Sequence, residues 1–253
     1  MLKEEKGLLS LVYKDTLRPS VQVIGKSLKA VFEFVSIPFM ALQLQNDKVK
    51  LNLEKRLDEY AQKLHSIPED KRCEVHPQIG LPIIEKLTYT TSDEIADLFT
   101  NLLASASSSD TVNTAHPAFI SMIERMSPDE ARILVYLKDN KDIPYCDINV
   151  FSNQDSGYIT LYEHITMIED DVALVYPQNV DVYLANLVSL GIMIDKKGTS
   201  ILERTQYNRI TEKYYIKEVA REFASKANKA IVAKESFYHV TPLGKQFIKA
   251  CIK

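Results

Sequence analysis

The sequence contains no tryptophan and few glycines or cysteines, with seven and three in 253 residues. The cysteines, Cys73, Cys146 and Cys251, are odd in number and far apart. This pattern supports neither a disulfide framework nor a four-cysteine zinc site, and it favours a reducing cytoplasm. The glycines are all isolated, so the chain has no glycine-rich phosphate loop, and nucleotide hydrolysis is not expected.

The sequence also lacks an apolar run long enough to span a bilayer. Its densest apolar stretch, residues 30–44, is about 15 residues long, whereas a membrane helix needs roughly 20, and Pro38 is expected to kink or end the helix. Within the apolar segment 17–44, helical spacing favours a buried core helix. The alternative is a helix lying on the inner membrane surface, as a peripheral contact. Its candidate membrane contacts are Phe32, Phe34, Phe39 and Met40. The first 15 residues lack the apolar core of a signal peptide.

Charge is unevenly distributed along the chain. Residues 196–253 carry 13 Lys/Arg against 5 Asp/Glu, whereas residues 1–195 carry 18 against 29. The basic end favours anionic partners, although lysines opposite an apolar stripe also solvate exposed helix faces. The candidate nucleic-acid contacts are Lys213, Lys217, Arg221, Lys226 and Lys229.

The clearest pattern lies in residues 89–137. Apolar residues from Ile95 to Ala106 recur with helical spacing, and Thr91 with Glu94 is typical of a capping box. A second helix start follows at Ser127, with Pro128 in the first turn and Glu130 completing another capping box. Two helices are therefore expected to flank a polar loop, residues 105–114.

Spacing and breaker residues predict the remaining elements. The expected helices cover residues 46–65, 82–87, 158–168, 179–190 and 211–234, with further helices beginning at Pro117 and Pro242. Residues 66–82 are expected to be irregular, and Gly191 is expected to end the helix before it. The expected strands are Ile143–Val150, Ile192–Asp195 and Phe237–Thr241.

This order of elements predicts a mostly α protein with two regions. A helical N-terminal region, 1–126, contains the apolar segment 17–44. The C-terminal region, 127–253, resembles a winged helix in an α+β arrangement, with a helical insertion of about 35 residues in the wing. That insertion departs from the compact winged-helix pattern.

No motif indicates a catalytic, cofactor or metal site. Cys73 and His76 form one C-x-x-H pair, but zinc requires four ligands and no second pair is suitably spaced. The acidic run 169–171 is typical of a solvated turn. Near the polar loop, Asp110, Asn113 and His116 lack a nucleophile-turn motif and are interpreted as a candidate contact surface.

Four phrases carry a family resemblance: YTTSDEIADLFTNLLASAS, AHPAFISMIERMSPDEARIL, VYLANLVSLGI and HVTPLGKQFIKAC. With the apolar segment TLRPSVQVIGKSLKAVFEFVSIPFMAL before them, they resemble the Abi-alpha family, bacterial proteins associated with abortive phage infection. The resemblance implies a role in phage defence. It implies no catalytic residue and no ligand.

The sequence therefore predicts a non-enzymatic defence protein whose partner is a phage or host protein. Nucleic-acid binding by the winged-helix-like region, membrane association through residues 17–44, and homo-oligomer formation stay open as alternatives. No cofactor is expected.

Overall fold

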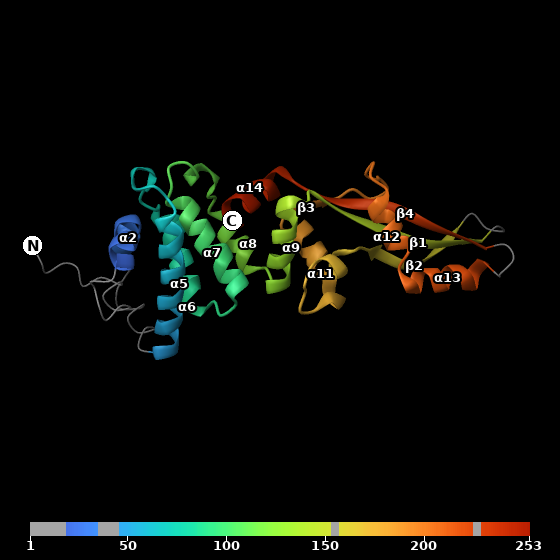
Figure 1. Ribbon diagram of the computed structural model, residues 1–253, viewed down its shortest axis with the longest axis horizontal. Helices are drawn as coiled ribbons and strands as arrows, with labels where there is room; N and C mark the ends of the chain where they lie inside the picture. The colour runs from blue at the N-terminus through green and yellow to red at the C-terminus, as the bar shows by residue number, and fades with distance from the viewer. Residues whose placement is uncertain (1–18, 35–45, 153–156, 225–228) are drawn as a thin grey trace, which may run out of the picture. The chain divides into compact units, whose positions relative to one another are not determined.

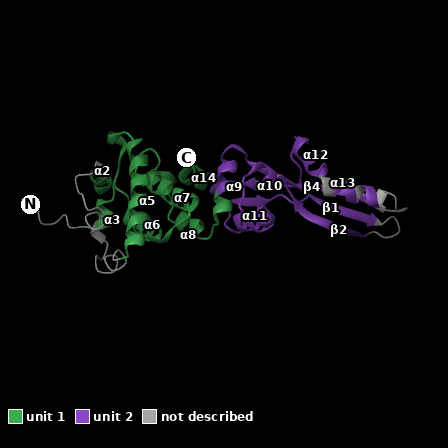
Figure 2. Cartoon of the chain, turned by 60° about the horizontal axis from the view of Figure 1, so that its bottom comes forward, with its two compact units in different colours: residues 1–131, 246–253 green, residues 132–245 purple. Residues whose placement is uncertain are grey.

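The computed structural model describes residues 19–34, 46–152, 157–224 and 229–253, which are mostly helical and contain one four-stranded antiparallel sheet (Figure 1). The chain forms two compact units (Figure 2). The helical unit comprises residues 1–131 and 246–253, and the sheet unit comprises residues 132–245. The sequence placed a boundary at residues 126 and 127; the division found here falls inside α9 (Pro128–Asp139) and α14 (Pro242–Cys251).

Besides the parts of α9 and α14 that belong to it, the helical unit contains short α-helices and 3-10 turns around two longer helices. Its elements are α2 (Pro19–Ser27), α3 (Lys29–Phe34), α5 (Asp47–His65), η1 (Glu69–Lys71), α6 (Pro77–Tyr89), α7 (Asp93–Ala106), η2 (Val112–Thr114) and α8 (Ala118–Glu124). The helix predicted over residues 46–65 is confirmed as α5. Its cap is Asn46, whose side chain accepts a hydrogen bond from the Lys48 amide at 3.0 Å, which satisfies a free amide of the first turn.

The described part of the apolar segment lies in the core. Ile24, Leu28 and Val31 are fully buried, as predicted for a core helix. A Cβ atom at Gly80 of α6 would lie only 2.4 Å from Cγ2 of Val31, so the missing side chain lets α3 approach α6 closely. The kink expected at Pro38 lies outside the described residues. Among the described helices, none has the length and apolar content that crossing a bilayer requires.

The predicted helix over residues 95–106 is confirmed as α7, but its predicted capping box is wrong. The helix begins at Asp93, so Ser92 is the cap. Ser92 Oγ accepts a hydrogen bond from the Ile95 amide at 3.3 Å and donates one to the Glu94 carboxylate at 2.8 Å. Thr91 stands one residue too early to reach these amides.

The second predicted capping box is confirmed at the start of α9. The Ser127 amide donates to the Glu130 carboxylate at 2.6 Å, and the Glu130 amide donates to Ser127 Oγ at 3.3 Å. Each side chain thus satisfies an amide that the helix leaves unpaired.

Residues 66–82 are more regular than predicted. They include η1, and α6 begins at Pro77 and continues through Pro82, so the helix predicted over 82–87 is longer at both ends. His76 caps α6, because its Nδ1 accepts a hydrogen bond from the Gln78 amide at 3.2 Å. Pro82 lies early in this helix, where its missing amide removes only one backbone hydrogen bond.

The sheet unit contains the four strands and the helices between them. Its elements are β1 (Asp142–Ser152), β2 (Tyr158–Ile165), α10 (Ile168–Asp171), η3 (Pro177–Asn179), α11 (Val180–Ser189), β3 (Met193–Asp195), α12 (Thr205–Thr211), α13 (Tyr214–Ala224) and β4 (Lys229–Val240). The strand order is β2-β1-β4-β3, with every pair antiparallel. A core of Cys146, Ile148 and Ile165 from the sheet packs against Tyr207 and Ile210 of α12 and Ile216 of α13.

Two predicted helices of this unit are wrong. Residues 158–168 form β2 followed by the start of α10, because their β-branched and aromatic residues pair with β1. The helix predicted over 211–234 is interrupted: α12 ends at Thr211, α13 ends at Ala224, and β4 has begun by Lys229. The apolar stripe assigned to one helix is therefore shared, with Ile216 on α13 and Ile231 on β4 contacting the same core.

The helix predicted over 179–190 is confirmed as α11, and Gly191 follows it with a φ of 73°. This left-handed conformation costs a glycine little, and it allows the Ile192 amide to donate to the Leu187 carbonyl at 3.1 Å. The chain then enters β3 directly.

The acidic run 169–171 is not a solvated turn. It forms most of α10, and its carboxylates pair with basic residues of α12 and of the segment that follows it. Asp171 accepts hydrogen bonds from both terminal nitrogens of Arg209, at 2.6 and 3.2 Å, while Lys213 pairs with Glu169 and Asp170. The run thus fixes α12 to the sheet unit.

The end of α14 closes the helical unit. Asn101 Nδ2 donates to the Cys251 carbonyl at 2.9 Å, and Ser105 Oγ donates to the Ala250 carbonyl at 2.8 Å. Both polar side chains are buried. They satisfy the carbonyl groups that a helix end leaves unpaired.

Gly244 provides a stability test of the start of α14. A Cβ atom there would lie 2.1 Å from the Ile192 carbonyl oxygen, a backbone atom that cannot move aside. We expect Gly244→Ala to lower the free energy of unfolding by about 1–3 kcal/mol because of this overlap. Urea titration followed by circular dichroism measures the change. Lys245→Ala, at an exposed neighbour, is the control, and equal midpoints for both variants would contradict the prediction.

Candidate functional site

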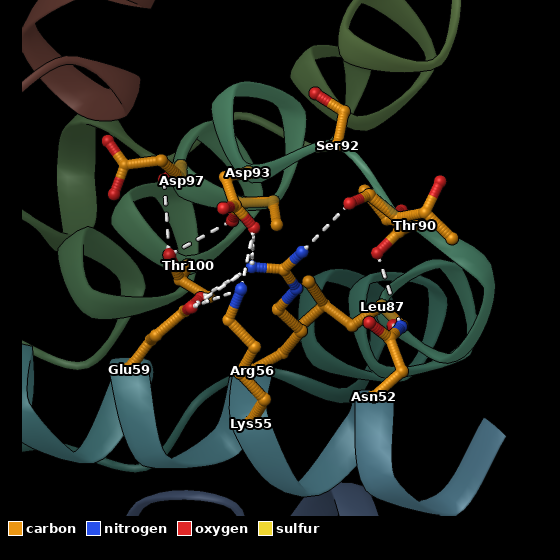
Figure 3. Close-up of polar contacts among 12 residues, drawn as sticks. Asn52, Lys55, Arg56, Glu59, Leu87, Thr90, Ser92, Asp93, Asp97 and Thr100 are labelled. Atoms are coloured by element: carbon orange, nitrogen blue, oxygen red, sulfur yellow. Dashed lines mark hydrogen bonds and ion pairs between the residues drawn. The ribbon is translucent and has the colours of Figure 1, made fainter. Parts of the chain in front are cut away.

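A buried arginine organises the polar contacts between α5 and the start of α7 (Figure 3). The Arg56 side chain is only 2% exposed. Its Nη1 lies 3.0 Å from the Glu59 carboxylate and 2.8 Å from that of Asp93, and its Nη2 donates to the Thr91 carbonyl at 3.2 Å. Arg56 Nε has no hydrogen-bond partner among the described residues. The guanidinium therefore neutralises two carboxylates and holds the chain that enters α7.

Lysines of α5 extend this network. Lys55 Nζ lies 2.7 Å from Asp93 Oδ1, and Lys63 Nζ lies 2.5 Å from Asp97 Oδ1 and donates to Thr100 Oγ1 at 2.7 Å. The hydrogen bond from Lys55, followed by that from Arg56, lowers the pKa of the Asp93 carboxyl group. The Asp93 carboxylate is thus held ionised, and Asp97 is paired with Lys63.

Asn52 connects the same surface of α5 to the end of α6. Its Nδ2 lies within hydrogen-bonding distance of the carbonyls of Leu87, Thr88 and Thr90, at 2.9, 3.2 and 3.2 Å (Figure 3). These carbonyls have no helical partner, so the amide caps α6. Because these polar groups are paired with one another, we interpret the network as a support that joins three helices.

Sequence reasoning predicted the helix over residues 46–65 but did not single out Arg56, and so missed this network. The spacing of Arg56 from the apolar residues of α5 could have indicated its burial. Arg56 follows Leu53 by three residues and precedes Tyr60 by four, which puts it on the buried stripe of α5.

The predicted contact surface lies beside the segment 71–73. Asp110 is exposed and pairs with Lys71 at 2.8 Å, and the Ser109 amide donates to the Lys71 carbonyl at 2.8 Å. Asn113 is exposed in η2. The serines that precede them at 105, 107 and 108 are buried. The loop is therefore packed on one side and exposes Asp110 and Asn113 on the other.

His116 completes that predicted surface and has a structural role. Its Nδ1 accepts a hydrogen bond from the Ala118 amide at 3.1 Å, and its ring lies 5.7 Å from that of Phe119. The imidazole thus satisfies the first amide of α8.

A cavity of about 420 Å³ lies beside Cys73, lined by α2 and the segment 69–74. Burial raises the pKa of the Cys73 thiol, so the thiol stays protonated and weakly nucleophilic. Cys73 Sγ contacts the Ala106 carbonyl at 3.6 Å, while His76 caps α6. Among the described residues, no group of three or more His, Cys, Asp or Glu side chains has the geometry of a metal site.

The structure describes only part of the predicted nucleic-acid contacts. Lys213 is 12% exposed and bound by Glu169 and Asp170. Lys217 and Arg221 are exposed on α13. Lys226 lies outside the described residues, and Lys229 begins β4.

Of the four predicted membrane contacts, the structure describes two. Phe32 is partly buried on α3, and Phe34 ends that helix. Phe39 and Met40 lie outside the described residues.

A second cavity, of about 380 Å³, lies in the sheet unit between the end of β2 and the start of α11. His164 lines it and has a φ of 51°, a left-handed conformation that is unusual for a side-chain-bearing residue. The His164 amide donates to Asp147 Oδ1 at 3.0 Å, which supports this backbone, and the ring of Tyr145 lies 5.0 Å from the imidazole. Tyr145 in turn donates to Asp195 Oδ1 at 2.8 Å. Sequence reasoning missed this site because it assigned residues 158–168 to a helix.

The Arg56 network predicts an unequal effect of two neighbouring substitutions. Arg56→Met removes hydrogen bonds to charged groups and leaves the Thr91 carbonyl without its partner. We expect it to lower the free energy of unfolding by about 2 kcal/mol. Lys55→Met, the matched control, removes a half-exposed partner of Asp93 and should cost less than about 1 kcal/mol. Urea titration of both variants measures the difference, and an equal loss would show that burial of Arg56 adds nothing.

The lowered pKa of Asp93 predicts a pH dependence. Since folding favours the ionised carboxylate, this contribution to stability is present above its ordinary pKa of about 3.9. It is lost as the pH falls through the lower folded-state pKa. Asp93→Asn should therefore reduce stability at pH 6 more than at pH 3, as measured by urea titration at both values. Equal losses would contradict this linkage.

Comparison with known proteins places the chain in a family. No curated protein matches it. Among solved structures, an uncharacterized protein from the hydrocarbon-degrading marine bacterium Alcanivorax borkumensis SK2 is 19% identical, over 54% of this chain and 93% of that one. The TM-score is 0.34, so this likeness informs neither fold nor function. The family model described as "Abortive infection alpha" matches residues 48–251. Because that match covers most of the sequence, including α5, α7, α11 and α14, the chain belongs to the abortive infection alpha family.

Proposed function

We propose that this protein is a non-enzymatic phage-defence protein that acts through contacts with a phage or host protein. The observation that carries the proposal is its membership of the abortive infection alpha family. The polar groups described at the start of α7 fit the non-enzymatic part of the proposal, because they are paired with one another and stabilise the helices.

The sheet unit supplies a surface of winged-helix type for these contacts. Support comes from the order α9, β1, α11, β3, β4 and from the pairing of β4 with both β1 and β3, which a winged helix shares. Two features are added to that pattern: β2 extends the sheet beside β1, and α12 and α13 stand between the wing strands.

Protein contact is favoured over base reading by the composition of α11. In a winged helix the corresponding helix enters the major groove. Here α11 has the sequence VDVYLANLVS, with no lysine or arginine, and it exposes Asp181 and Val182. An acidic and apolar helix is poorly suited to approach phosphates.

The defence role predicts fewer plaques when the gene is expressed. Cells carrying the intact gene and cells carrying the same gene with an early stop codon are challenged with a broad panel of phages. We expect the plating efficiency of at least one phage to fall only with the intact gene. Equal plating of every phage in both strains would contradict the proposal.

The protein-contact mechanism predicts weak binding to duplex DNA. Titration of the full chain with DNA at two salt concentrations measures this binding, with Lys217→Gln and Arg221→Gln as variants. Phosphate contacts would make affinity fall steeply with salt. We expect neither a steep fall nor an effect of these substitutions, and tight, salt-sensitive binding that either variant weakens would favour the nucleic-acid alternative.

A further inference from the structure

Large apolar side chains line the cavity at the start of α11 or neighbour its lining residues along the chain. Its lining includes Tyr162 and Val180. Adjoining its lining residues along the chain are Tyr176, which is 57% exposed, and Val182, which is 66% exposed. Solvent exposure of large apolar side chains beside a cavity marks a surface suited to a protein partner.

Three carboxylates line the same cavity, and they differ in their surroundings. Glu169 is already neutralised, because Thr166 donates to its Oε2 at 2.9 Å and Lys213 pairs with its Oε1. In the part of the chain that the structure describes, Asp181 and Glu163 have neither a hydrogen bond nor an ion pair. Among the described lining residues, three carboxylates face one imidazole, that of His164, which acts electrostatically on Asp181. The cavity wall is therefore predominantly acidic.

The positions of these two carboxylates follow from the fold. Asp181 lies in the first turn of α11, and Glu163 lies near the end of β2, beside His164. The lining groups that act electrostatically on Asp181 are His164 and Glu163 of β2 and Glu169 of α10. Because Lys213 is engaged by α10, it does not compensate Asp181 or Glu163.

We propose that this cavity binds an arginine side chain of a partner protein segment, with apolar residues of that segment lying on Tyr176 and Val182. The inference rests on the proposed protein-contact function and deepens it. Charge complementarity selects a cation, and the guanidinium group suits the site because it stacks on aromatic rings and bonds carboxylates through several donors. The cavity volume of about 380 Å³ is at the lower end of the usual range for ligand pockets, about 300–1,000 Å³.

The test uses the full chain and two fluorescein-labelled peptides, Ac-Ser-Leu-Arg-Leu-Ser-amide and the same peptide with citrulline in place of arginine. Citrulline keeps the shape of arginine and removes its charge. Fluorescence anisotropy is expected to show binding of the arginine peptide and on the order of tenfold weaker binding of the citrulline peptide. Equal binding of the two peptides, or binding of neither, overturns the proposal. Stronger binding of a single-stranded oligonucleotide that displaces the arginine peptide also overturns it.

Substitutions locate the interaction. The double variant Asp181→Asn with Glu163→Gln is expected to bind the arginine peptide on the order of tenfold more weakly, while Glu203→Gln, at an exposed carboxylate elsewhere in the sheet unit, binds as the unaltered protein does. A charge-exchange experiment tests the same contact by a gain of binding, which a loss of protein stability cannot produce. Asp181→Lys should bind the peptide with glutamate in place of arginine better than the unaltered protein does. If the double variant binds normally and the exchange gains nothing, the cavity is not the site.

Plaque assays separate this inference from the proposed function. If the intact gene and Glu203→Gln reduce plaques but the double variant does not, the defence role and the cavity proposal are both supported. If the double variant protects cells fully, the cavity proposal fails although the defence role holds. If the intact gene gives no protection, the defence role fails, and the peptide measurements alone decide whether the cavity binds arginine.

Discussion

The sheet unit depends on the pairing of one strand with two neighbours. β4 is hydrogen-bonded to β1 from Asp142 to Ser152 and to β3 at its other edge. Because α12 and α13 lie between β3 and β4 in the sequence, the return of β4 joins β3 to β1 and buries the core against those helices. The acidic run of α10 then fixes α12 through Arg209 and Lys213. The cavity at the start of α11 is lined in part by Glu169 of α10 and by residues at the end of β2.

The sequence was sufficient where helical spacing and capping residues agreed. The helices α5, α7, α9, α11 and α14 were all predicted, since their apolar stripes and start signals are local. It was insufficient where the partner decides the structure. Residues 158–165 become a strand because β1 offers an edge, and the region 211–234 is divided because Ile231 reaches the same core from a strand.

Charged residues showed the same limit. The run 169–171 reads as a solvated turn until Arg209 and Lys213, some 40 residues later, are brought to it. Arg56 was not singled out, although its spacing from Leu53 places it on the buried stripe of α5. The cavity carboxylates Glu163 and Asp181 were not singled out, because only the fold brings the end of β2 and the start of α11 to one cavity. The family resemblance was confirmed independently of these errors.

The hydrogen bonds from Asn101 and Ser105 to the end of α14 have a consequence for biosynthesis. Asn101 and its acceptor Cys251 are 150 residues apart in sequence. The ribosome therefore makes α7 well before its partner helix exists, and the hydrogen bonds from Asn101 and Ser105 to α14 cannot form until α14 emerges. Until then Asn101 has only Asp97 of its own helix, at 3.0 Å, among these acceptors. The core of the helical unit around α7 is therefore completed only after the sheet unit has been synthesised.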